Sequence, residues 1–71
     1  MTLREFMEDY EGFDFENETI VLFDADICKQ YLISSYAYRI VYLTDERLNK
    51  IVFAWTHTEN VMSIILKTPE E

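Results

Sequence analysis

The chain has 71 residues, of which 49% are apolar and 28% charged, and it carries a formal net charge of −8 at pH 7. This length gives room for one small domain, and the apolar content is too high for an intrinsically disordered chain. With one cysteine, one histidine and one glycine, the sequence excludes a disulfide scaffold, a multi-cysteine zinc site and a glycine-rich phosphate-binding loop.

An amphipathic helix is predicted over about residues 2–10. Thr2, followed three residues later by Glu5, has the form of a capping box. Apolar residues then recur at i, i+3, i+4 and i+7 and form one stripe: Leu3, Phe6, Met7 and Tyr10. Gly12 is expected to end this helix, because glycine is the usual residue just beyond a helix C-terminus.

A strand is predicted over residues 19–23, after an acidic loop at residues 12–17. The strand is apolar at both odd and even positions, which indicates a central strand or one covered on both faces. Residues 26–35 fit a short helix or a strand equally well. Residues 36–43 alternate between two faces and are predicted to form a strand, with Tyr36, Tyr38, Ile40 and Tyr42 on one side.

The C-terminal part is predicted to form a hairpin of residues 51–56 and 61–67, after a turn or single helical turn at 44–49. If Thr56 faces Val61, one face places Phe53, Trp55 and Ile64 beneath Phe6 and Met7 of the helix. The other hairpin face carries Val52, Ala54, Val61 and Ile65. Residues 68–71 are expected to be a frayed tail.

These elements predict an α+β fold in a single domain over residues 1–71, with the N-terminal helix packed on one face of a small, mostly antiparallel sheet of three to five strands. One helix covers one face, so the second hairpin face stays apolar and exposed. Such a face indicates self-association, and we expect a homodimer through four residues: Val52, Ala54, Val61 and Ile65. The alternative function is therefore a small homo-oligomeric structural or accessory protein that assembles through this face.

Catalytic chemistry finds little support in the sequence. His57 lies in the predicted hairpin turn without a nearby nucleophile, which favours a solvated side chain. Cys28 is adjacent to Lys29, whose ammonium can activate a thiol, but a buried and inert cysteine is the commoner case. We therefore predict no catalytic residue, no cofactor and no metal site. A small hydrolase or metal-dependent enzyme is the weaker alternative, since it depends only on these two side chains and scattered acids.

The negative charge is concentrated in residues 1–26, which hold nine acidic side chains against Arg4 alone. This distribution disfavours direct nucleic-acid binding, because phosphates would be repelled. It favours a protein partner with a basic surface, where carboxylates spaced like phosphates could occupy a nucleic-acid-binding channel. The alternatives are an acidic surface that is merely solvated and self-association, in which these acids pair with basic residues of a second copy: Lys29, Arg39, Lys50 or Lys67. The predicted partner-binding acids are Glu8, Asp9, Glu11, Asp14, Glu16 and Glu18.

The expected location is the cytoplasm, because a lone thiol suits a reducing compartment and no segment is long and apolar enough to cross a bilayer. The start of the chain also lacks the basic and then apolar layout of a signal peptide. No membrane partner is therefore expected.

Four segments carry a resemblance to a known group of proteins: Thr2–Met7, Thr19–Asp24, Leu48–Val52 and Ser63–Leu66. In this pattern of elements the chain resembles the small uncharacterised proteins of phages, prophages and mobile elements of Gram-positive bacteria. The resemblance implies a phage-borne or accessory protein. Some proteins of that kind inhibit host defence enzymes by binding to them.

Overall fold

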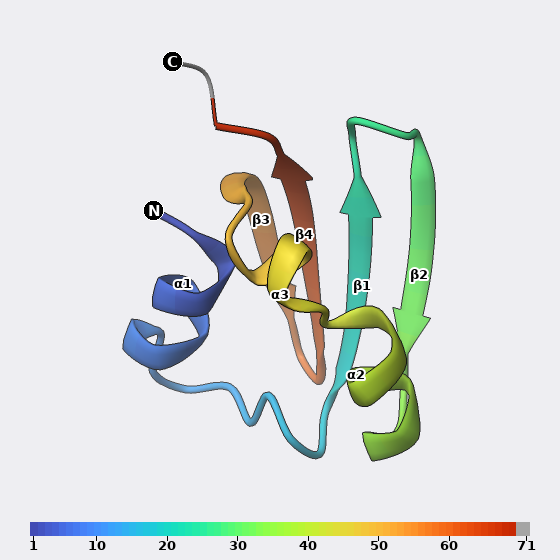
Figure 1. Cartoon of the computed structure of the whole chain (residues 1–71). Coiled ribbons are helices and arrows are strands. Elements are labelled where there is room, and N and C mark those ends of the chain that lie inside the picture. The colour runs from blue at the N-terminus through green and yellow to red at the C-terminus, as the bar shows by residue number, and fades with distance from the viewer. Residues whose placement is uncertain (70–71) are drawn as a thin grey trace.

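The computed structural model describes residues 1–69, and within them a four-stranded sheet carries three helices on one face (Figure 1). The elements follow in the order α1 (Leu3–Asp9), β1 (Thr19–Asp24), β2 (Lys29–Ile33), α2 (Tyr36–Tyr42), α3 (Asp45–Leu48), β3 (Ile51–Thr58) and β4 (Val61–Lys67). No helix in residues 1–69 has the length and apolar character needed to cross a bilayer.

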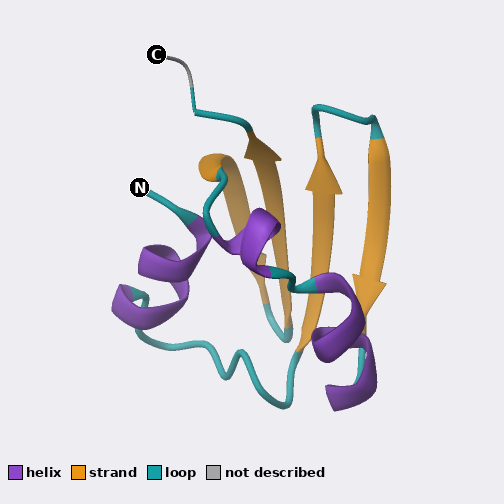
Figure 2. Ribbon diagram, in the orientation of Figure 1, coloured by secondary structure: helices purple, strands orange, loops and turns teal. Residues whose placement is uncertain are grey.

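The strand order is β2-β1-β4-β3, with β1 and β4 parallel and the two outer pairs antiparallel. All three helices lie on the same side of the strands (Figure 2). The predicted fold class, an α+β domain with the N-terminal helix on one face of a small and mostly antiparallel sheet, is confirmed.

The predicted capping box begins α1. The Thr2 hydroxyl accepts a hydrogen bond from the Glu5 backbone at 3.2 Å, and the Glu5 carboxylate accepts one from the Thr2 backbone at 3.0 Å. The helix ends at Tyr10, its C-cap, whose backbone is extended. Gly12 follows with a φ of +90°, in the left-handed region that glycine adopts without strain. Gly12 therefore turns the chain beyond the helix and does not itself cap it.

The core lies between the helices and the sheet. Because side chains alternate along a strand, the parallel pairing of β1 with β4 places Ile20 beside Met62 and Leu22 beside Ile64 on the helix side. The buried apolar residues are Leu3, Phe6, Phe15, Ile20, Leu22, Ile33, Met62, Ile64 and Leu66. Strand β1 is central, as the sequence predicts, but helices cover only one of its faces.

The hairpin of β3 and β4 closes through a two-residue turn at residues 59–60, and Thr58 faces Val61. The predicted pairing of Thr56 with Val61 is therefore wrong by two residues. A shift of two leaves side chains on their predicted faces, because the strand period is two. Trp55 accordingly faces the helices and contacts Phe6, with the ring centroids 5.4 Å apart.

A β-bulge between Val52 and Ala54 changes the faces of the first part of β3. The extra residue is Phe53, which is 68% exposed, so its predicted position beneath the helix is wrong. Because of the bulge, Val52 packs against the core instead of lying on the uncovered face. Its backbone N–H donates to the Met1 carbonyl at 2.9 Å, which ties this part of the strand to the N-terminus. A bulge of this kind leaves no clear signal in a pattern of alternation.

The prediction of a strand over residues 36–43 is wrong, since residues 36–42 form α2. Arg39, Tyr42 and Leu43 stand at i, i+3 and i+4, a helical spacing, and they point inward. The Tyr42 ring stacks on Tyr31 of β2 with centroids 4.7 Å apart. The alternating tyrosines are thus compatible with both periods, and contacts to β2 and to the loop before β1 select the helix.

Two further segments form a strand and a short helix. Residues 29–33 of the ambiguous segment form β2, the strand alternative. The predicted helical turn at 44–49 is confirmed as α3, where the Thr44 hydroxyl accepts from the Arg47 backbone at 3.3 Å. At the end of the chain, Thr68 of the predicted tail donates a hydrogen bond to Asp26, and residues 70–71 lie outside the described range.

Candidate protein-binding surface

Helix α2 turns its apolar side outward. Arg39 is its only charged residue and its only buried one, at 8% exposed. A surface helix normally directs its apolar stripe at the core and its charges at water. Here the outer side carries large exposed hydrophobic residues at 70%, 45%, 66% and 60% exposure: Tyr36, Tyr38, Ile40 and Val41. Several large apolar side chains exposed on one short helix make α2 a candidate interaction surface.

The Arg39 guanidinium binds the loop of residues 11–18, called the acidic loop below. Its Nε donates to the Phe15 carbonyl, and its Nη2 donates to the Glu18 carbonyl at 2.9 Å. Burial lowers the pKa of Arg39, and the nearby Asp14 and Glu16 carboxylates partly offset this change. The guanidinium stays charged because its ordinary pKa is far above neutrality. One buried cation therefore joins the exposed apolar helix to the acidic loop.

The acidic loop has a defined shape of its own. The Asp14 carboxylate accepts hydrogen bonds from the Glu16 and Asn17 backbones at 3.0 and 3.3 Å and from the Asn17 side chain at 2.7 Å. The Glu18 carboxylate accepts from the Asp14 backbone at 3.4 Å. Asp14 and Glu18 thus shape the loop as well as adding charge. A preorganised loop loses less conformational entropy when it binds a partner.

Acid should remove part of the stability that Asp14 provides. The hydrogen bonds from the Asn17 side chain, and then from the Glu16 backbone, lower the pKa of Asp14. A lowered pKa contributes stability above the unfolded value of about 3.9, and this contribution is lost as the pH falls through the folded value. We expect Asp14→Asn to be less stable than the wild type at neutral pH and equally stable in strong acid. Urea unfolding across this range measures the gap, and a gap independent of pH would contradict the assignment.

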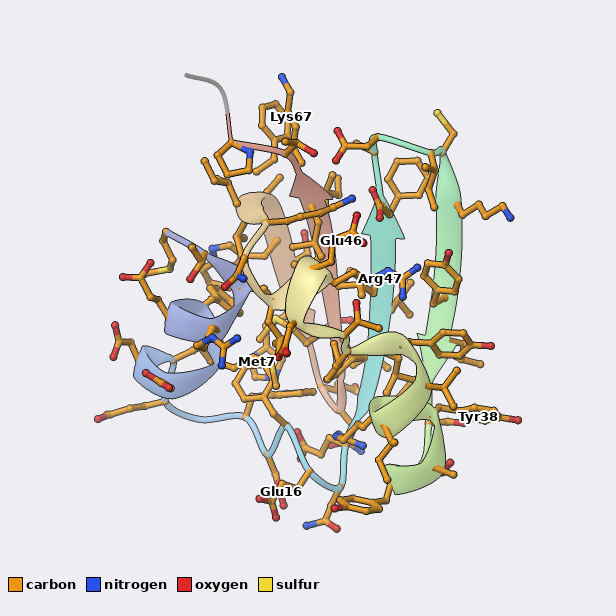
Figure 3. The ribbon with its side chains drawn as sticks, viewed as in Figure 1. Met7, Glu16, Tyr38, Glu46, Arg47 and Lys67 are labelled. Carbon is orange, nitrogen blue, oxygen red and sulfur yellow. The ribbon has the colours of Figure 1, made fainter. Side chains whose placement is uncertain are left out.

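The six predicted partner-binding acids lie on α1 and the acidic loop. Glu8 and Asp9 are in the last turn of α1, and the other four belong to the loop: Glu11, Asp14, Glu16 and Glu18. All are exposed except Glu18, which is half-buried. Figure 3 shows Glu16 and Tyr38 at the same lower end of the molecule, on the acidic loop and on α2.

None of these six acids forms an ion pair within residues 1–69. The ion pairs there join Arg4 to Asp45 and join Arg47 and Lys50 to Asp24 and Asp26, while the Arg39 guanidinium binds carbonyl groups. The basic side chains are thus largely occupied elsewhere in the domain. The acidic loop and the end of α1 therefore keep their negative charge toward solvent.

The four predicted self-association residues are not all on one surface. Ala54, Val61 and Ile65 lie on the face of the sheet that carries no described helix, as predicted. Val52 lies on the helix side because of the bulge, and its assignment to the self-association surface is wrong.

His57 and Cys28 differ from their predicted environments. His57 belongs to β3, where its Nε2 lies 3.0 Å from the Glu59 carbonyl and its Nδ1 lies 3.0 Å from the Tyr10 hydroxyl. A carbonyl only accepts, so Nε2 donates within the hairpin, and Nδ1 joins the hairpin to Tyr10 at the end of α1. Cys28 is exposed in the β1–β2 turn and not buried, with a φ of +52°.

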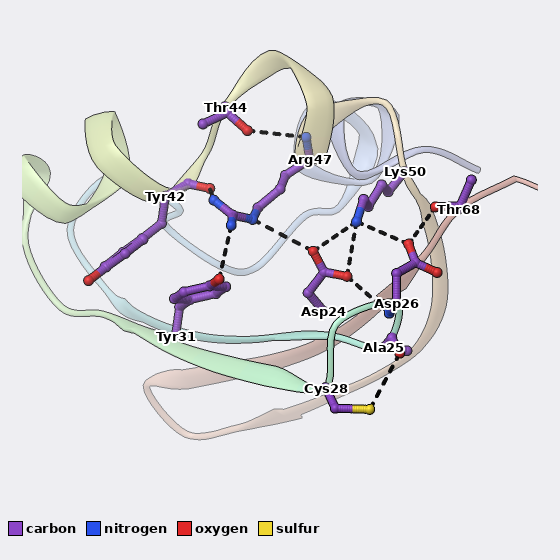
Figure 4. Close-up of polar contacts among 10 residues, drawn as sticks. All are labelled: Asp24, Ala25, Asp26, Cys28, Tyr31, Tyr42, Thr44, Arg47, Lys50 and Thr68. Carbon is purple, nitrogen blue, oxygen red and sulfur yellow. Dashed lines mark hydrogen bonds and ion pairs between the residues drawn. The ribbon is translucent and has the colours of Figure 1, made fainter.

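A buried charge cluster at the end of β1 is the largest feature that the sequence did not reveal (Figure 4). Asp24 is 2% exposed and accepts two hydrogen bonds from the Lys50 ammonium, at 2.8 and 2.9 Å. Lys50 also pairs with Asp26 at 3.0 Å, and Arg47 lies 3.8 Å from Asp24 and donates to the Tyr31 hydroxyl at 3.0 Å. Asp24 and Lys50 are 26 positions apart in the sequence, so no local pattern reveals this pairing.

This cluster borders a cavity of about 300 Å³ that is lined by Asp24, Ile27, Thr44, Glu46, Arg47 and Lys50. Burial alone lowers the pKa of Lys50, but the hydrogen bonds and charges of Asp24 and Asp26 together outweigh burial and raise it. The amine is therefore protonated at neutral pH and is not a nucleophile. We interpret the cluster as a tie between α3, the start of β3 and the end of β1. Within residues 1–69 no group of three or more His, Cys, Asp or Glu side chains could hold a metal ion.

Comparisons with known proteins place the chain in no family: no family model, no curated protein and no solved structure matches it. The resemblance to phage and mobile-element proteins therefore stays a prediction. What can be said of function comes from the chain's own surfaces.

Proposed function

We propose that the chain is a non-enzymatic protein-binding module whose acidic loop and α2 together bind a basic surface of another protein. The observation that carries this proposal is the inversion of α2, which buries Arg39 and exposes Tyr36, Ile40 and Val41. The Arg39 guanidinium donates hydrogen bonds to carbonyls of the acidic loop, so it links the exposed apolar helix to the loop that carries the exposed carboxylates.

The two parts of this surface have different roles in binding. Tyrosine is enriched in protein interfaces, and buried aromatic anchors at the centre of an interface supply most of its affinity. Exposed carboxylates at the rim attract a basic partner, raise the association rate and fix the orientation of the complex. The expected partner thus presents an apolar patch surrounded by Lys and Arg.

Surfaces that bind nucleic acids combine these properties, because they hold phosphates with cations and stack bases on apolar and aromatic groups. The carboxylates of the acidic loop would take the place of phosphates there. Together with the resemblance to phage proteins, this supports a more specific form of the proposal, in which the chain is an inhibitor that occupies the nucleic-acid-binding surface of a host or defence protein.

The test is affinity capture with two charge-reversal variants of equal charge. Glu8→Lys with Glu16→Lys removes acids from the proposed surface, and Asp45→Lys with Glu46→Lys removes two exposed acids from α3. We expect the wild type and the second variant to capture the same protein from a bacterial lysate at low salt, with recovery falling at high salt. The first variant should lose it at least tenfold. Equal capture by both variants would overturn the proposal.

A second matched pair of variants tests the apolar part of the proposed binding surface. Ile40→Ser removes an exposed side chain from α2, and Ile27→Ser removes one of 51% exposure from the β1–β2 turn, at the other end of the sheet (Figure 1). Both residues are exposed, so neither change should unfold the domain. We expect Ile40→Ser to weaken binding of the captured protein at least tenfold in a titration, and Ile27→Ser to leave it unchanged. A larger loss of binding with Ile27→Ser than with Ile40→Ser would mean that the apolar contact does not lie on α2.

A further inference from the structure

We infer that the uncovered face of the sheet binds the same face of a second copy of this chain, so that two sheets pack as a sandwich with the helices outside. This surface is separate from the acidic loop and α2, and the inference does not depend on the proposed function. Helices cover the opposite face of the sheet, and in the described part of the chain none lies on this one (Figure 2).

The uncovered face carries large apolar side chains beside positions held by Thr, Ser and Gln. Its positions follow from the pairing of the strands, because Val21 faces Leu32 across β1 and β2, and Ala54 faces Ile65 across β3 and β4. An antiparallel or mixed sheet with one face in water usually carries polar residues there. The apolar side chains on this face are Val21, Phe23, Leu32, Ile51, Ala54, Val61 and Ile65.

The charge distribution indicates what covers this face. Asp24 is the only acid in the four strands, and it points to the helix side. Within the described residues, the strands therefore place no carboxylate on the uncovered face of a chain of net charge −8, and the one charged side chain that they place there is Lys67, at the end of β4. It is the surface on which two such acidic molecules can meet with least repulsion. A sandwich keeps the acidic loop and α1 of both copies on the outside.

The area of the uncovered face determines how strong the dimer is expected to be. Four strands about 4.8 Å apart and about six residues long, at about 3.3 Å per residue, give roughly 400 Å² per copy. Two copies then bury roughly 800 Å², which is below the 1,200 Å² or more of stable complexes and typical of weak, reversible ones. Sheets also pack face to face at about 10 Å in known sandwiches. The dimer should therefore form in the micromolar to millimolar range and respond to concentration.

Sedimentation equilibrium over this range, on the full chain, tests the inference with a matched pair of variants. Ile65→Lys places a charge at the centre of the uncovered face, and it acts twice because a two-fold interface uses the same patch on both copies. Ile40→Lys places the same charge on α2. We expect the wild type to dimerise more strongly at moderate salt, Ile65→Lys to weaken the dimer at least tenfold, and Ile40→Lys to leave it unchanged.

A second measurement keeps the test independent of any loss of folding in Ile65→Lys. In a Cys28→Ser background, Ser63→Cys places a thiol on the uncovered face of β4, and Ala37→Cys places one on exposed α2. The maleimide labelling rate of Ser63→Cys should fall as the protein concentration rises, while that of Ala37→Cys should not. A monomer at every concentration, or protection at position 37 instead of 63, would overturn the inference.

Discussion

Phe6→Ala is expected to destabilise the domain by about 3–5 kcal/mol, the usual cost of removing a buried aromatic ring. Phe6 is 3% exposed and its ring contacts those of Tyr10, Phe15 and Trp55, at centroid distances of 5.2, 6.0 and 5.4 Å. A chain of this size has a total stability of about 4–10 kcal/mol. The melting temperature should therefore fall by more than about 12 °C. Thermal unfolding followed by circular dichroism measures this effect.

Phe53→Ala is the matched control, because it removes the same ring from a side chain that is 68% exposed. A surface substitution of this kind changes stability by about 0.5 kcal/mol or less. The comparison checks the bulge in β3, because a regular strand would have buried Phe53 beneath α1. Equal destabilisation by the two substitutions would mean that the register of β3 differs from the one described.

Lys50→Met is the second substitution with a large expected effect, again about 3–5 kcal/mol, because it leaves a buried carboxylate without its main partner. Asp24 would keep the hydrogen bond from the Asp26 backbone at 3.1 Å and the charge of Arg47, whose Nε lies 3.8 Å away and forms no hydrogen bond with it. The side chain of Met is close to that of Lys in length, so packing changes little. Urea unfolding of both proteins at neutral pH gives the difference in free energy.

The control for this substitution is Lys29→Met, which removes the same charge from an exposed position on β2. It should change the free energy of unfolding by about 0.5 kcal/mol or less. Adding Asp24→Leu to Lys50→Met should recover much of the lost stability, because the unpaired buried charge is then gone. If Lys50→Met were as harmless as Lys29→Met, the buried cluster would not be a structural tie.

Local signals in the sequence predicted the parts of the fold that local interactions determine. The capping box of Thr2 and Glu5 and the cap of Thr44 involve residues three positions apart, and both helix starts were predicted. The apolar run at residues 19–23 predicted a central strand for the same reason. The faces of Trp55 and Ile64 also follow from simple alternation, even with the hairpin register two residues off.

The parts that were not predicted depend on distant contacts. Residues 36–42 alternate like a strand, and the helix is selected by the bonds of Arg39 to Phe15 and Glu18, more than twenty positions away. The bulge at Phe53 accompanies the backbone bond of Val52 to Met1 at the other end of the chain. The acids of the candidate surface were evident from charge alone. The apolar half of that surface was not, because a strand over 36–43 would have placed its tyrosines in a sheet.

The most direct test of the proposed binding surface is hydrogen–deuterium exchange of the full chain, with and without the captured protein. A partner that covers the acidic loop and α2 should slow amide exchange in residues 11–18 and 36–43 together, because Arg39 couples the two segments. Exchange in β3 and in the β1–β2 turn should stay unchanged. Protection of one of these two segments without the other, or protection confined to the strands, would contradict the proposal that they form a single binding surface.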